Sequence, residues 1–237
     1  MLKEVMSNTL SYFIIGCGHF GSQAAEKLFR KDPHSRITVV DKDVKAIQKI
    51  SSLPVKTILG EGISSLRQCL IKGQPIDYIV PAVPLHLAFE FLWSTLKSYD
   101  VTRVKVPLLS GLPNSMIGKT GDFYTSLANF LCPEDCPEPS EYCTVTKQRR
   151  PKPLYQILNE LEGAFESRVI RSQQLAPGVG GYPPAALSGL LENIKKRMAP
   201  RRTLLISTSC RCHGVTSALL FSPNKQTRIP HSSLIAE

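Results

Sequence analysis

Short apolar runs alternate with amphipathic segments along the first 110 residues of the chain. The apolar runs are typical of buried strands, and the segments between them place apolar side chains three or four positions apart, as helices on a sheet do. Strands are expected at residues 13–15, 37–40, 55–59, 76–80 and 104–109, and helices at 22–30, 43–51, 64–71 and 86–99. This alternation predicts an α/β fold with a doubly wound parallel sheet.

The first predicted strand leads into a glycine-rich turn that precedes the first helix. Gly16, Gly18 and Gly21 have the spacing of a loop that binds the pyrophosphate of a dinucleotide. The first glycine allows a tight turn, the second lets a phosphate approach the backbone, and the third lets the helix lie close to the strand. His19 and Phe20 lie inside the motif and are expected beside the nucleotide.

An aspartate at the end of the second predicted strand completes this pattern. Asp41 lies 20 residues after Gly21, where a carboxylate accepts hydrogen bonds from the ribose of NAD(H). A glycine triplet alone indicates no more than a turn, but two strands, a helix and the acid in register favour a Rossmann-type nucleotide site. The charge of Asp41 disfavours the 2′-phosphate of NADP(H), although the adjacent Lys42 offers that phosphate a partner.

Residues 11–110 resemble the TrkA-N domains, the nucleotide-binding domains of potassium-transport regulators, also called RCK N-terminal domains. The likeness rests on the glycine motif and on three further segments, residues 39–43, 60–62 and 76–80. It implies a domain that binds NAD(H), with Asp41 on the adenosine ribose and Glu61 beside the nucleotide, where the family usually has Gly-Asp-Ala. It also implies a homodimer.

The chain is expected to divide into a Rossmann domain at residues 1–110 and a cysteine-rich insert with a C-terminal α/β extension at residues 111–237. The insert is rich in turn residues and contains one short expected helix, residues 122–131. A helix at 154–165 follows, and then a β-loop-α-β unit with elements at 167–175, 184–198 and 203–208. We expect this unit to extend the first sheet, with a separate small domain as the alternative.

Five of the seven cysteines lie in the second half of the chain, in two clusters. The candidate metal ligands are Cys132, Cys136 and Cys143 in the insert, and Cys210, Cys212 and His213 after the last predicted strand. Such ligands suit zinc or an iron–sulfur cluster, and a nearby hydride carrier favours the cluster. Neither spacing matches the usual ferredoxin or zinc-finger patterns, so reduced cysteines in a core are the alternative.

Composition and charge narrow the function further. The hydrophobic content of 42% is that of a globular protein, and no apolar run reaches the roughly 20 residues that cross a membrane. The N-terminus lacks the apolar core of a signal peptide, so a cytoplasmic protein without a disulfide framework is expected. The net charge of +10 is dispersed, which favours a solvated basic surface over a nucleic-acid interface.

Three classes of function are consistent with these patterns. The first is an NAD-dependent oxidoreductase with a substrate or a metal centre near the cysteine insert. The second is an NAD(H)-sensing regulatory module of the potassium-transport type, and the third, a nucleic-acid-binding protein, is supported by charge alone. His86 begins a helix near the end of the fourth predicted strand, where it suits a general acid or a structural role. The sequence leaves catalysis undecided.

Overall fold

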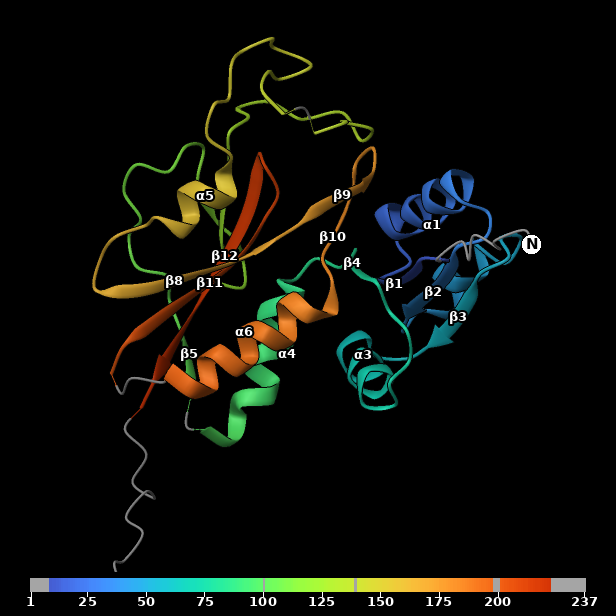
Figure 1. Ribbon diagram of the computed structural model, residues 1–237, viewed down its shortest axis with the longest axis horizontal. Coiled ribbons are helices and arrows are strands. Elements are labelled where there is room, and N and C mark those ends of the chain that lie inside the picture. Colours follow the sequence, from blue (N-terminus) through green and yellow to red (C-terminus); the bar gives the residue numbers. More distant parts are fainter. Residues whose placement is uncertain (1–8, 100, 139, 198–200, 223–237) are drawn as a thin grey trace, which may run out of the picture.

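Two large sheets of different kinds and one two-stranded hairpin form the described part of the chain, which is residues 9–99, 101–138, 140–197 and 201–222 of this computed structural model. Figure 1 shows the first sheet at the right and the second at the left. The first eight residues and residues 223–237 lie outside the described part. No helix among the described residues is long and apolar enough to span a membrane.

The first sheet is parallel, with the strand order β3-β2-β1-β4. Its strands are β1 (Ser11–Ile15), β2 (Arg36–Asp41), β3 (Lys56–Leu59) and β4 (Tyr78–Pro81), and α1 (His19–Lys31), α2 (Val44–Gln48) and α3 (Gly62–Ile71) connect them in order. Strand β1 is buried along its whole length, as a central parallel strand with both faces covered requires. The prediction of a Rossmann-type α/β sheet is confirmed.

The second sheet is mixed, with the order β6-β7-β12-β11-β8 and with β5 also paired to β12. Its strands are β5 (Val101–Val104), β6 (Met116–Ile117), β7 (Phe123–Ser126), β8 (Phe165–Arg171), β11 (Thr203–Ser209) and β12 (His213–Phe221). The accompanying helices are α4 (Leu87–Leu96), the short 3-10 helix η1 (Lys97–Tyr99), α5 (Leu154–Asn159) and α6 (Pro184–Arg197). The predicted β-loop-α-β unit is present, because β8 and β11 are parallel neighbours joined through α6.

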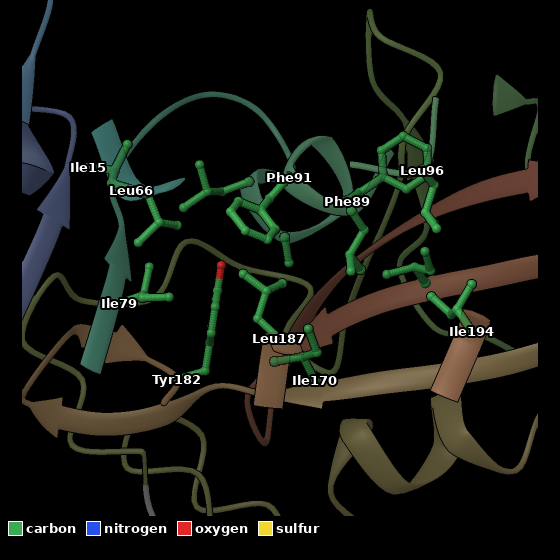
Figure 2. Close-up of a cluster of buried hydrophobic side chains, with 14 of the residues drawn as sticks. Ile15, Leu66, Ile79, Phe89, Phe91, Leu96, Ile170, Tyr182, Leu187 and Ile194 are labelled. Atoms are coloured by element: carbon green, nitrogen blue, oxygen red, sulfur yellow. The ribbon is translucent and has the colours of Figure 1, made fainter. Parts of the chain in front are cut away.

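One apolar core joins the two sheets. Figure 2 shows Ile15 and Ile79 of the first sheet in the same cluster as Phe89 of α4, Leu187 of α6 and Ile170 of β8. Buried side chains of α4 and α6 thus share one apolar cluster with residues of both sheets.

A hairpin of β9 (Gln173–Ala176) and β10 (Val179–Gly181) makes a second connection between the sheets. Figure 1 shows it reaching toward α1. Just after the hairpin, Tyr182 exchanges backbone hydrogen bonds with Ile79 of β4 at 2.8 and 3.0 Å. Near the hairpin turn, Lys27 Nζ of α1 donates to the carbonyl oxygen of Pro177 at 3.1 Å.

The expected extension of the first sheet is wrong, because the C-terminal strands build the second sheet instead. The strand predicted at residues 104–109 is wrong, because residues 105–109 form no strand and β5 (Val101–Val104), which pairs with β12, ends where the prediction begins. The division into domains at residue 110 stays a prediction, and the pairing of β5 places the change of sheet before that residue.

Two expected helices also differ from the structure. Residues 122–131 contain strand β7, in which Phe123 and Thr125 are buried and alternate with half-buried neighbours, so the true period is two. The helix expected at 154–165 ends at Asn159, and β8 already begins at Phe165. The helix expected at 184–198 is α6, and Met198 lies outside the described residues.

Candidate functional site

The glycine motif forms the turn between β1 and α1, as the pattern predicts. Gly16 has φ of +99°, and a Cβ there would lie 2.4 Å from the carbonyl oxygen of Ala82. A Cβ on Gly21 would lie 2.0 Å from the carbonyl oxygen of Gly16, so α1 touches the turn backbone to backbone. Gly18 is exposed, immediately precedes α1, and would meet nothing within 4 Å. The space beside Gly18 is therefore open, at a helix N-terminus of the kind that binds phosphate groups.

The carboxylate of Asp41 is held beside this turn at the end of β2. The backbone N–H of Cys17 donates to Asp41 Oδ2 at 2.6 Å, and that of Asp43 donates to Oδ1 at 2.8 Å. The carboxyl edge of an open α/β sheet is where such folds bind their ligands. The adjacent Lys42 is exposed. These residues fit the ribose half of a dinucleotide.

Glu61 has a capping role that the sequence did not indicate. Its carboxylate accepts the backbone N–H of Ile63 at 3.0 Å and that of Ser64 at 2.7 Å, which caps the N-terminus of α3. A contact between Glu61 and the nucleotide stays a prediction.

The cysteine insert lies against the N-terminus of α1. His19 Nε2 is 2.9 Å from Glu134 Oε1, and Gln23 Nε2 donates to Glu134 Oε2 at 2.8 Å. Lys27 Nζ donates to the carbonyl oxygen of Glu134 at 3.0 Å. The insert is thus fastened to the helix that follows the glycine motif.

All the predicted metal ligands line one cavity of about 740 Å³. They come from the insert and from the turn between β11 and β12, and are Cys132, Cys136, Cys143, Cys210, Cys212 and His213. Phe20 of the glycine motif lines the same cavity, so the cavity adjoins the nucleotide loop. The two cysteine clusters therefore meet in space, whereas their metal-binding role stays a prediction.

Two of these sulfurs accept backbone hydrogen bonds in the same way. Cys210 Sγ accepts the N–H groups two and three residues further along, at 3.4 and 3.3 Å, and Cys143 Sγ accepts the corresponding pair. Burial raises the pKa of the Cys143 thiol, but these bonds and the charge of Arg150 outweigh it and lower that pKa to about 7. Burial dominates at Cys210 and raises its pKa to about 11.

Other polar groups of the cavity contact three of the thiols. Arg150 Nη1 donates to Cys212 Sγ at 2.9 Å. The ring of His213 lies between two thiols, with Nε2 3.6 Å from Cys132 Sγ and Nδ1 3.9 Å from Cys210 Sγ. Within the described part of the chain, however, no three His, Cys, Asp or Glu side chains are arranged so that they could hold a metal ion.

A smaller cavity of about 250 Å³ lies at the carboxyl end of β4. Pro81 and Val83 form part of its wall. Val83 lies close to Gly16, because a Cβ added to Gly16 would be 2.9 Å from Val83 Cγ1. This cavity therefore begins beside the glycine turn. It adjoins the cysteine cavity, because both are lined by Tyr124, Thr208 and Val215.

Sequence reasoning missed a buried polar network beside this smaller cavity. His86 Nδ1 is 2.8 Å from Ser217 Oγ, and His86 Nε2 is 2.9 Å from Thr208 Oγ1. Ser217 Oγ also donates to Asp122 Oδ1, which accepts from Arg103 at 2.7 Å. Burial lowers the pKa of His86 to about 4, with Asp122 opposing the shift and Arg103 adding to it. The only available signal was the run of Ser and Thr within two apolar strands.

Comparison with known proteins finds similarity to two families and to an archaeal protein. The TrkA-N domain model matches residues 12–69, which confirms the resemblance seen in the sequence. A family model described as "Uncharacterized protein, C-terminal domain" matches residues 86–222, more than half of the 237 residues. An "Uncharacterized protein" of Archaeoglobus fulgidus is 29% identical over 219 residues, which are 87% of this chain and 97% of that protein.

Proposed function

The chain belongs to the family described as "Uncharacterized protein, C-terminal domain" and also carries a TrkA-N domain, and from this premise we propose that it is an NAD(H)-binding redox protein. In this proposal, the Rossmann domain within residues 1–110 holds the nucleotide. The region within residues 111–237 supplies the cavities in which a second reactant lies. Nicotinamide, when bound, supplies a hydride acceptor or donor.

The observation that carries this proposal is the position of the two cavities next to the glycine loop. Phe20 lines the cysteine cavity, and Val83, in the wall of the smaller one, packs beside Gly16. We assign the pyrophosphate to the turn and the N-terminus of α1, and the ribose to Asp41. The proposed nucleotide-binding residues are Gly16, Gly18, His19, Phe20, Gly21, Asp41, Lys42 and Glu61.

Asp41→Ala is expected to weaken NAD(H) binding by roughly 10- to 100-fold, the effect of losing charge-assisted hydrogen bonds to the ribose. Wild-type protein is expected to bind NAD(H) more tightly than NADP(H), because the carboxylate repels a 2′-phosphate. Asp41→Asn keeps the shape of the side chain and removes its charge, so it should reduce the difference in affinity between NAD(H) and NADP(H). Calorimetric titration of both nucleotides measures these affinities, and wild-type protein that binds NADP(H) as tightly as NAD(H) would contradict the assignment.

We also propose that the cysteine cavity takes a thiophilic metal centre, either an iron–sulfur cluster or zinc. Three features support this: the convergence of five thiols and one imidazole, the backbone N–H groups directed at two sulfurs, and the cationic Arg150 beside a third. Because no set of ligands is arranged for coordination as it stands, binding requires the insert and the β11–β12 turn to approach each other.

Protein purified without oxygen is expected to contain iron or zinc in near-stoichiometric amount. Cys136→Ser should release the metal, because it removes one ligand from the insert. Cys69→Ser is the matched control, since Cys69 is buried in α3 of the first domain, away from the cavity. Elemental analysis and a UV–visible spectrum of each sample make the measurement. Folded wild-type protein that lacks metal would end this part of the proposal.

The contact between Glu134 and α1 favours a second candidate, a regulatory module that senses NAD(H). A pyrophosphate at the N-terminus of α1 brings negative charge to the helix end where the Glu134 carboxylate contacts His19 and Gln23. Nucleotide binding would then release the insert as a signal. In this case hydrogen exchange of the insert rises with NAD(H), and no substrate is turned over. The homodimer and the cytoplasmic location stay predictions.

A further inference from the structure

A buried chain of hydrogen bonds links a carboxylate to the wall of the smaller cavity. It runs from Asp122, just before β7, through Ser217 on β12 and His86, just before α4, to Thr208 on β11. Asp122, Ser217 and His86 are buried, whereas Thr208 is half-buried and lines both cavities. His86 also lines the smaller cavity, so the network reaches the cavity wall at His86 and at Thr208.

The carboxylate sets the direction of the first two hydrogen bonds. Burial raises the pKa of Asp122, but hydrogen bonds from Ser217 and Thr120 and the charge of Arg103 outweigh it and keep that pKa below its ordinary value. An ionised carboxylate only accepts, so the Ser217 hydroxyl donates its proton to Asp122. The Ser217 oxygen then accepts the proton of His86 Nδ1 at 2.8 Å.

The same reasoning fixes the tautomer of His86. Its low pKa keeps the imidazole neutral at pH 7, and a neutral imidazole carries a single N–H. Because Nδ1 holds that proton, Nε2 has a free lone pair and accepts the Thr208 hydroxyl at 2.9 Å. An unprotonated nitrogen that accepts a hydrogen bond from a hydroxyl at a cavity wall is the arrangement of a proton acceptor that acts through that hydroxyl.

We propose that Thr208 and His86 form a proton-transfer site for an alcohol or its carbonyl product in the smaller cavity. The alcohol gives its proton to the Thr208 oxygen while the Thr208 proton moves to His86 Nε2. Because an alkoxide is far more basic than His86, this transfer would accompany loss of the hydride from the alcohol carbon, which leaves a carbonyl and an imidazolium, and the reverse transfers restore the alcohol. This inference rests on the proposed function in one respect: the hydride of the alcohol carbon needs the bound nicotinamide as its acceptor.

The cavity selects the class of ligand. Its volume is about 250 Å³, and its wall is mostly apolar, with Pro81, Val83, Leu85 and Val215. Among the described residues that line it there is no Asp, Glu, Lys or Arg. A small uncharged alcohol, aldehyde or ketone fits such a space, and a carboxylate or phosphate has no partner in it.

Charged groups near His86 affect how readily its imidazole takes up a proton. Asp122 lies behind Ser217 and offsets the charge of an imidazolium, whereas Arg103 opposes it. Arg103 is in turn paired with Glu90 of α4 at 2.6 Å, which moderates that opposition. The other titratable groups in the cavity wall are the phenols of Tyr124 and Tyr182. A neutral base with a compensating carboxylate nearby is thus preorganised.

The test uses 2,2,2-trifluoroethanol, a small uncharged alcohol with a fluorine reporter, on the full chain with and without NAD⁺. Fluorine NMR gives its affinity, and ¹⁵N NMR of the histidine rings gives the state of His86 Nε2. Thr208→Val keeps the shape of the side chain but removes its hydroxyl, and Thr208→Ser keeps the hydroxyl. We expect Thr208→Val to lower the affinity for the alcohol by about tenfold, because one hydrogen bond is lost. Thr208→Ser should bind the alcohol as tightly as wild-type protein does.

In wild-type protein, the alcohol should also shift the His86 Nε2 resonance, because it changes the hydrogen bond that Thr208 donates to this nitrogen, and Thr208→Val should abolish that shift. A network that only supports the fold would instead lower the melting temperature in Thr208→Val and leave alcohol binding unchanged, which overturns the proposal. Wild-type protein that binds no alcohol in either condition overturns it too. NAD⁺ titration of the same samples tests the proposed function separately, because the experiment without NAD⁺ decides the proton site alone.

Discussion

Gly18→Val is expected to abolish nucleotide binding while the fold stays intact. Gly18 has φ of −68°, which any L residue adopts, and a Cβ there meets no protein atom within 4 Å. The added side chain instead fills the open space before α1, where a pyrophosphate would contact the helix N-terminus. Affinity for NAD(H), measured by calorimetry, should fall by at least about 100-fold, because the phosphates lose direct contact with the backbone.

Gly21→Ala is a useful comparison in the same loop, because it should lower stability, which Gly18→Val should not. A Cβ at Gly21 would lie 2.0 Å from the carbonyl oxygen of Gly16, so α1 must move away from the turn. The free energy of unfolding is expected to drop by about 1–3 kcal/mol, as it does for overpacked sites. Thermal unfolding separates the two variants. Gly18→Val with wild-type affinity for NAD(H) would contradict the assignment of the phosphate site.

The nucleotide domain could be predicted because its signals are local. The glycine motif, the apolar strands and Asp41 all lie within about 30 residues, and each imposes its own backbone requirement: a tight turn, a buried strand or a strand end. The order β3-β2-β1-β4, which the structure supplies, is that of half a Rossmann fold. The capping role of Glu61 was missed because an acid before a helix suits a cap and a ligand contact equally.

The second sheet could not be predicted because its pairings join distant segments. Strand β12 pairs with β5, β7 and β11, and the choice among such partners depends on the tertiary core. Strand β7 is only four residues long, and its Phe123 fits a helix with Leu127 as well as it fits a strand with Thr125. Short apolar runs of this kind are ambiguous between helix and strand.

The cysteines and His86 show the same contrast. The two cysteine clusters could be picked out as candidate ligands, because both are unusual residues in a turn-rich segment or at a strand end, but the sequence favoured their meeting only if the strand before Cys210 lay in the first sheet, and that strand, β11, lies in the second. The partners of His86 could not, since Ser217 and Thr208 lie 131 and 122 residues away in the sequence. Serine and threonine in a strand are too common to indicate one particular hydrogen bond.

His86→Gln is expected to make the protein less sensitive to acid. In wild-type protein, His86 is 2% exposed and its pKa is about 4, against an ordinary value of 6.5. Between these values the unfolded chain binds a proton at this residue and the folded chain does not, so wild-type stability falls as the pH falls. The loss from this residue should be about 2 kcal/mol between pH 7 and pH 4.5.

Glutamine suits this experiment because its amide can donate to Ser217 and accept from Thr208 without titrating. Urea unfolding at both pH values gives the change in unfolding free energy for each protein, and the difference between the two changes isolates His86. The lowered pKa of His213 contributes in the same direction, but it is present in both proteins and cancels. Asp122 does not confuse the result, because its pKa lies below its ordinary value of 3.8 and hence below this window. Equal acid sensitivity in the two proteins would mean that His86 takes up its proton without unfolding, and the neutral tautomer on which the Thr208 hydrogen bond depends would then be wrong.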